Sequence, residues 1–167
     1  MKTKNLTSKE TIEEMTKLVQ DIKIAFLLTG LKKQPINAVP MITKKVDEHG
    51  NIWFLSRLDS EHNINIAKDP QVQLLYSDPS NMEYLSVSGN ASIVSDKKII
   101  ENFHSAEDDT WFRDADPSKY SAIKIVPKEA YFWDSSGNTL NKLFKRGLAD
   151  VKGENPDIIE KKGKLSL

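Results

Sequence analysis

Six short apolar or alternating runs occupy most of the chain between residues 24 and 135. They are IAFLLT (24–29), INAVPMITKKV (36–46), NIWFLS (51–56), VQLLYS (72–77), MEYLSVSGNASIVS (82–95), and AIKIV (122–126) with AYFWDS (130–135) around Pro127. Turn-forming segments such as DEHG (47–50) and DPSN (78–81) separate them. Runs of this kind with short connections predict antiparallel strands.

Helices are predicted around these strands. Residues 7–20 carry apolar side chains at spacings of three and four, which indicates an amphipathic helix. Ser60 and Asp96 are suitable N-caps for two more, and the helix after Ser60 must end before Pro70, which disfavours the α conformation in the preceding residue. A short amphipathic helix is expected over residues 138–148. The acidic stretch before Trp111 and Phe112 is interpreted as a loop.

The length of 167 residues suits one domain with a sizeable core. About six strands with short connections and peripheral helices predict an α+β fold, in which an antiparallel sheet closes into a barrel. We expect this domain to cover residues 1–149. The polar residues 150–167 are expected to form a loosely held tail.

Composition and missing motifs exclude several classes of function. The chain has no cysteine, which excludes disulfides, thiolate nucleophiles and Cys-ligated metal centres. Basic and acidic side chains both number 24, so no net charge attracts nucleic acid or an anionic membrane. The three histidines lie in separate segments without metal-ligand spacing, and no metal site is expected. Neither a GxGxxG, a GxxxxGK nor a GxSxG motif can be written.

The cellular location is predicted from what the chain lacks. Its longest strongly apolar stretch, residues 24–28, is too short to span a membrane, and MKTKNLTSKE at the start contains no signal-peptide apolar region. We therefore expect a cytoplasmic protein.

Six segments follow one another in an order that is typical of a known family. They are Pro40-Met41, Gly50-Asn51-Ile52-Trp53-Phe54, Ser60-Glu61-His62, Tyr84-Leu85-Ser86-Val87-Ser88-Gly89, Trp111-Phe112 and Tyr131-Phe132-Trp133-Asp134. Over roughly residues 8–136, the chain resembles the general stress protein branch of the pyridoxamine-5′-phosphate-oxidase-like superfamily, the FMN-binding split β-barrels. The resemblance implies a split barrel, FMN as cofactor, and a homodimer that shares the flavin site between subunits.

The physical requirements of a flavin site point to the same segments. A phosphomonoester needs cations, hydroxyls and backbone N–H groups, which Ser60-Glu61-His62 offers at a helix start. The isoalloxazine ring needs a flat apolar slot with backbone donors and acceptors, which residues 39–42 beside residues 54–56 can provide. The expected cofactor-binding residues are Val39, Pro40, Met41, Ile42, Phe54, Leu55, Ser56, Ser60, Glu61, His62, Tyr84, Ser86, Trp111 and Phe112.

Two departures from the family pattern concern the phosphate. Val39 stands where the family usually has arginine, and His62 stands where it usually has lysine. The resemblance implies that both replaced residues hold the FMN phosphate. A hydrogen bond to a charged group contributes about 1.5–3 kcal/mol, so these losses would weaken FMN by roughly one to several decades. Lys44, Lys45 or Arg57 could compensate.

Three functions stay open at this point. The first is a flavin-dependent oxidoreductase or flavin reservoir in a stress response, in which the flavin accepts hydride or electrons and no catalytic side chain can be assigned. The second is a non-catalytic module that sequesters flavin. The third is a barrel that has lost FMN and acts as an interaction module. Pyridoxamine-phosphate oxidase activity itself is less expected, since no basic motif near the C-terminus matches the substrate-phosphate contacts of that enzyme.

Overall fold

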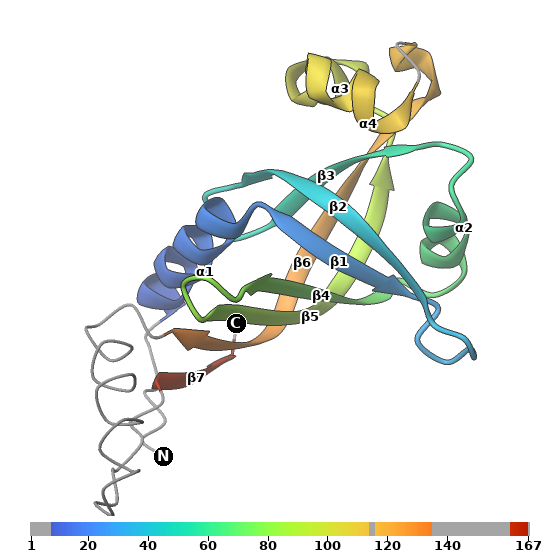
Figure 1. The fold of residues 1–167 in the computed structure, drawn as a ribbon. Helices are drawn as coiled ribbons and strands as arrows, with labels where there is room; N and C mark the ends of the chain where they lie inside the picture. The colour runs from blue at the N-terminus through green and yellow to red at the C-terminus, as the bar shows by residue number, and fades with distance from the viewer. Residues whose placement is uncertain (1–7, 114–115, 135–160, 167) are drawn as a thin grey trace, which may run out of the picture.

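The computed structural model describes residues 8–113, 116–134 and 161–166 (Figure 1). Its elements are α1 (Ser8–Ile22), β1 (Ile24–Thr29), β2 (Asn37–Val46), β3 (Ile52–Arg57), α2 (Glu61–Lys68), β4 (Gln71–Asp78), β5 (Glu83–Val94), α3 (Lys97–Phe103), α4 (Ala106–Phe112), the 3-10 turn η1 (Pro117–Lys119), β6 (Tyr120–Asp134) and β7 (Lys161–Ser166).

Six antiparallel strands close into a barrel, which confirms the predicted fold class. The strand order is β3-β2-β1-β4-β5-β6, and β6 pairs back onto β3. One strand can serve both neighbours because β6 is 15 residues long. Its first part, residues 120–125, pairs with β3, and it pairs with β5 over residues 122–133. Inward-facing side chains such as Leu27, Phe54 and Ile123 are fully buried and form the core.

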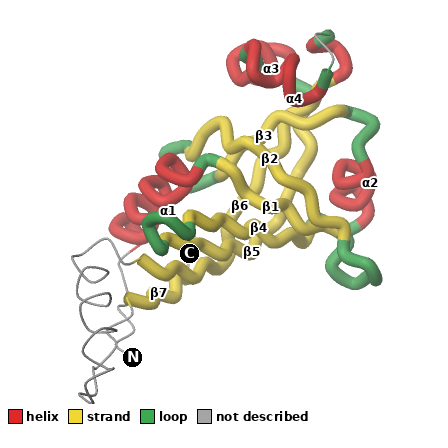
Figure 2. The backbone as a smooth tube through the Cα atoms, viewed as in Figure 1, coloured by secondary structure: helices red, strands yellow, loops and turns green. Residues whose placement is uncertain are grey.

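Helices cover the barrel ends (Figure 2). α1 lies at one end, where Met15, Leu18 and Val19 enter the core, and α2 lies at the other, where Ile66 does so. Asp96 caps α3 as expected, because its side chain accepts a hydrogen bond from the backbone of Ile99. α3 and α4 lie together outside the barrel (Figure 1).

The last barrel strand is continuous where the sequence suggested two pieces. AIKIV and AYFWDS both belong to β6, and Pro127 lies where the register with β5 shifts. A proline is tolerated at such a bulge because it has no N–H to donate to the ladder. Gly89 permits the close approach, since a Cβ there would stand 2.4 Å from the carbonyl oxygen of Val126.

Two elements differ from the sequence-based expectation. The acidic stretch before Trp111 is helix α4 and not a loop, because Ser105 and Asp108 form a reciprocal capping box and acidic residues occupy its first turn. Within the expected C-terminal tail, residues 161–166 form β7, which pairs with residues 129–134 of β6. The helix expected at 138–148 and the domain boundary at 149 lie outside the described residues.

Candidate cofactor site

The barrel is split between β2 and β3. The ladder between these strands joins only residues 43–46 to residues 52–54 and contains a bulge. Within the described residues, positions 37–42 of β2 pair only with β1, and positions 55–57 of β3 pair only with β6. On the side of each strand that faces the split, these residues make no ladder with the described part of the chain, so backbone donors and acceptors are available to a planar polar ligand. The Arg57 carbonyl is an exception, because it accepts hydrogen bonds from Ser60 and Asn63.

The predicted slot residues lie along these edges, but their side chains do different things. Met41 and Phe54 point into the core, with 3% and 0% of their surface exposed, so only their backbones can face a ligand. Val39 is half-buried and packs against the same core, whereas Pro40 is exposed. Leu55 belongs to a second cluster with Ile100 and Tyr120 beneath α3. The apolar wall of the slot is thus partly the barrel core itself.

A buried polar network ties the end of β3 to α2 and β6. The Ser56 hydroxyl donates to Oδ1 of Asn63 (3.0 Å) and lies 2.7 Å from Nε2 of His62. Asn63 Nδ2 then donates to Ser121 Oγ at 2.9 Å. Ser56 and Ser121 are fully buried and sit opposite each other in the β3–β6 ladder. Each member of this network can donate a hydrogen bond to the next, from His62 through Ser56 and Asn63 to Ser121.

Ser60 occupies the N-cap position of α2, but its hydroxyl does not cap the helix. The side chain makes no capping hydrogen bond and instead donates to the backbone carbonyl of Arg57 at 2.8 Å. Asn63 Nδ2 donates to the same carbonyl at 2.9 Å. The hydroxyl at the helix start is therefore engaged within the protein.

Of the cations expected at the phosphate, His62 is neutral and Arg57 is paired with a carboxylate. Burial lowers the pKa of His62 from 6.5 to about 4, so its ring is neutral at pH 7. Arg57 donates from two nitrogens to the two carboxylate oxygens of Asp59, at 3.0 and 3.1 Å. That hydrogen bonding lowers the pKa of Asp59 and keeps it ionised. Glu61 adds an exposed carboxylate in the first turn of α2.

Lys44, a candidate for compensation, is committed elsewhere. Its ammonium lies 2.6 Å from Asp108 on α4, and the two side chains are only 10% and 3% exposed. Asp108 also accepts hydrogen bonds from the backbone and side chain of Ser105. Lys45 is exposed on the other side of the bulge.

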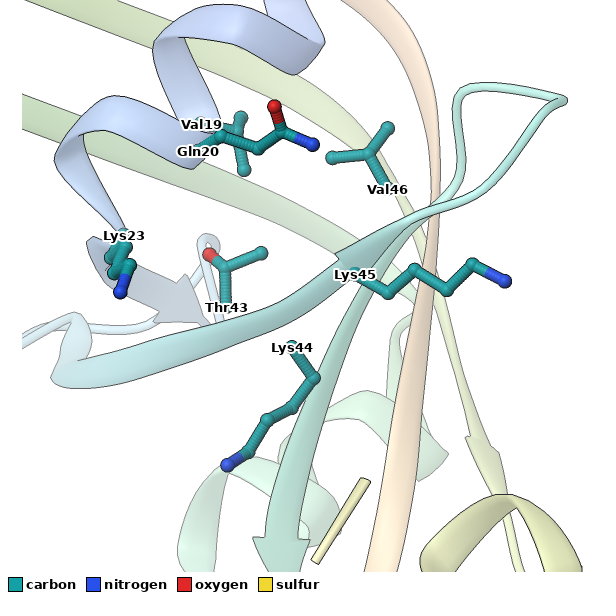
Figure 3. Close-up of a pocket in the computed structure, with 7 residues that line it drawn as sticks. All are labelled: Val19, Gln20, Lys23, Thr43, Lys44, Lys45 and Val46. Carbon is teal, nitrogen blue, oxygen red and sulfur yellow. The ribbon is translucent and has the colours of Figure 1, made fainter. Parts of the chain in front are cut away.

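A cavity of about 240 Å³ lies beside this bulge, between the end of α1 and β2 (Figure 3). Its lining includes Lys23, Lys44 and Lys45, yet Figure 3 shows these side chains pointing in different directions and not toward a common point. Thr43 faces inward there and its hydroxyl lies 2.8 Å from that of Tyr76. The cavity is not built to hold an anion.

The single chain does not bring all the predicted residues together. Ser86 pairs with Tyr131 on β6, whereas Ser56 pairs with Ser121, ten positions earlier on the same strand. Tyr84 pairs with Trp133, which lies two positions beyond Tyr131 on β6 and further from the split. These residues lie on the outer surface of the barrel, away from residues 37–42.

α4 carries the two aromatic residues of the predicted set. The ring of Phe112 lies 5.1 Å from that of Tyr120, which pairs with Arg57 at the end of β3. Trp111 exposes 44% of its surface. Of this pair, Phe112 packs at the β3 end of the split, and Trp111 faces outward.

An apolar row crosses the outer surface of the sheet. Directly opposed residues of antiparallel strands share a face, and the register aligns Pro40, Phe26, Leu75, Ser86 and Tyr131 on five successive strands. Phe26 and Leu75 expose 52% and 40% of their surface at the centre of this row. Exposed aromatic and aliphatic side chains side by side are typical of an interaction surface.

A protein-family model described as "Pyridoxamine 5'-phosphate oxidase like" matches residues 10–157. The chain belongs to this family. No curated protein sequence gives a significant match. Within the described residues, no group of three or more His, Cys, Asp or Glu side chains could hold a metal ion, and every helix is too short or too polar to cross a membrane.

Solved structures of other proteins show the same fold. A putative general stress protein 26 from Jannaschia sp. CCS1 has 21% identity and a TM-score of 0.69, with 95% of this chain and 99% of that one covered. A pyridoxamine 5'-phosphate oxidase-related, FMN binding protein from Nostoc punctiforme PCC 73102 has 12% identity and a TM-score of 0.61, with 79% and 86% covered. At these identities the likeness shows the fold alone.

Proposed function

We propose that two copies of this chain bind a flavin at each split between β2 and β3, and that the flavin carries out oxidation and reduction in a stress response. The observation that carries the proposal is the pair of strand edges, 37–42 and 55–57, that lie outside the ladders among the described residues. The pyrimidine edge of an isoalloxazine alternates donors and acceptors, which such edges can match. The stress role is carried over from the general stress proteins that share the fold.

A second copy completes the site. The row across the outer surface has β2 at one end, β5 toward the other, and the Phe26–Leu75 pair between them. A two-fold axis that passes beside this pair and runs along the strands sets β5 of one copy opposite β2 of the other. Tyr84 and Ser86 would then approach the split of the partner, which they cannot reach in their own barrel.

The chain's contribution is to position the ring. When bound, a flavin supplies hydride or electron transfer itself. The strand edges orient its polar side, the core residues behind Val39 exclude water from one face, and the partner's β5 covers the other. Trp111, which is exposed on α4, would contact the outer part of the ligand or the partner.

Binding and mass measured together test this function. We expect added riboflavin or FMN to lose fluorescence on titration with the protein, with one flavin per chain, and light scattering to give about twice 18.9 kDa. A protein that binds neither flavin, or that binds one tightly as a monomer, contradicts the proposal. Photoreduction followed by a screen of electron acceptors separates an oxidoreductase from a module that only holds flavin.

A further inference from the structure

The start of α2 is the polar end of the proposed flavin site, so an inference about it rests on the proposed function. A flavin mononucleotide carries a phosphate of nearly two negative charges at this end, whereas riboflavin carries only an uncharged ribityl hydroxyl. Which of the two fits depends on the charge and the hydrogen-bonding state of the side chains between β3 and α2.

The side chains here are satisfied by one another. The hydroxyls of Ser56 and Ser60 and the amide of Asn63 all bond to partners within the protein. His62 directs Nε2 at Ser56, 2.7 Å away, and not outward. A phosphate would have to break these bonds to gain the hydroxyls, and none of these four side chains would offer it a charge in return.

The surrounding charges also disfavour a dianion. Val39 contributes no charge from β2, and Arg57 is already bonded to both oxygens of Asp59. The exposed carboxylates of Asp59 and Glu61 flank the first turn of α2, where they already complement the positive end of the helix. Burial keeps the His62 ring neutral. Backbone N–H groups of the first turn remain to attract an anion, together with Lys119, whose charge already acts on Asp59.

We propose that this site is selective for a flavin with an uncharged tail, so that the protein binds riboflavin at least as tightly as FMN. Ribityl hydroxyls can donate to and accept from the partly exposed Ser60 hydroxyl by exchanging hydrogen bonds one for one, which leaves no charge unpaired. The phosphate of FMN loses hydration on binding, and the hydrogen bonds available here do not offset that cost.

Titration of riboflavin and FMN by flavin fluorescence at neutral pH tests this selectivity on the full chain. We expect a Kd for riboflavin equal to or below that for FMN. The Glu61→Lys variant changes an exposed side chain and should fold normally, and it should tighten FMN by about tenfold or more while leaving riboflavin nearly unchanged. His62→Lys should act in the same direction. His49→Lys, on an exposed turn away from α2, is the matched control and should change neither Kd.

The outcomes separate the two claims. FMN bound tenfold or more tightly than riboflavin by the native protein would overturn the selectivity and leave the flavin function standing. A Glu61→Lys variant that tightens both flavins equally would place the α2 start outside the site, which also overturns it. No binding of either flavin would overturn the flavin function and the selectivity together.

Discussion

Two helices, α4 and α2, are joined to the barrel through buried polar side chains. The contacts of α4 are charged, whereas those of α2 are neutral. α4 is tied to β2 by a charged pair, Lys44 with Asp108, whose side chains are almost fully buried. α2 is tied to β3 and β6 by hydroxyls, an amide and a neutral ring, with Ser56 and Asn63 at the centre. Both networks are satisfied, and no buried side-chain nitrogen or oxygen among the described residues lacks a hydrogen-bond partner.

The difference shows how the charge near the split is used. Lys44 is one of the few cations close in sequence to the split, and it forms an ion pair with Asp108 that attaches α4. At the α2 end Arg57 is paired with Asp59, the His62 ring is neutral, and Glu61 adds a negative charge. A charged network has one arrangement that avoids an uncompensated ion, whereas neutral hydroxyls can exchange partners at low cost. The charged pair therefore suits the attachment of a helix, and the neutral network suits contact with a neutral ligand.

Replacement of Lys44 should give the largest effect on stability. Lys44→Met leaves Asp108 buried without its counter-charge, and we expect the free energy of unfolding to fall by about 3–5 kcal/mol in urea denaturation. Lys9→Met is the control, because Lys9 and Glu13 form an exposed pair on α1 and should contribute less than about 1 kcal/mol. Equal losses in the two variants would contradict the contrast between the networks.

Acidification should weaken the α2 attachment next. The pKa of His62 is about 4 in the folded protein and roughly 6.5 in the unfolded chain, so the unfolded state binds a proton first as the pH falls. The stabilisation is fully present above pH 6.5 and is lost toward pH 4, by at most about 3 kcal/mol because the ring is partly solvated. Unfolding free energies across this window check it. In the His62→Gln variant the unfolding free energy should depend less on pH across this window. In His49→Gln it should depend on pH as in the native protein.

Removal of the central amide should have a smaller effect. Asn63→Ala removes the amide that donates to the buried Ser121 hydroxyl and accepts from Ser56, which keeps its contact with His62, and about 2 kcal/mol of unfolding free energy should be lost. Asn102→Ala, on the exposed side of α3, should stay within about 0.5 kcal/mol of the native protein. A loss as large as that of Lys44→Met would mean that the neutral network cannot rearrange.

Much of the fold could be predicted because strand runs and turn residues are local signals. The helix α4 could not, since its capping box joins Ser105 to Asp108 across residues that look only acidic, and its position depends on Lys44. β7 was missed because a lysine-containing strand has no apolar alternation. Such a composition is common at sheet edges, where charge discourages further pairing.

The sequence predicts which segments form the candidate site, but not the charge and hydrogen bonding of their side chains. Residues 39–42 and 54–56 were expected side by side, and the structure adds that the ladder between them ends at Thr43. His62 was expected as a potential cation, yet its charge depends on burial of the ring beside Ser56 of β3, which no local pattern reveals. Asn63 and Ser121 were not foreseen, and the only signal was a polar residue on the core-facing side of α2.

The central claim is that the flavin site exists only between two copies, and Phe26→Asp tests it most directly. Phe26 lies at the centre of the outer row and its side chain is half-exposed, so a charge there should separate the copies without disturbing the core. Ser92→Asp, exposed on β5 outside this row, is the control. We predict that light scattering gives about 18.9 kDa for Phe26→Asp and that riboflavin binding weakens at least about a hundredfold, while the control stays dimeric and binds normally. A Phe26→Asp monomer that binds riboflavin as tightly as the native protein would contradict the account.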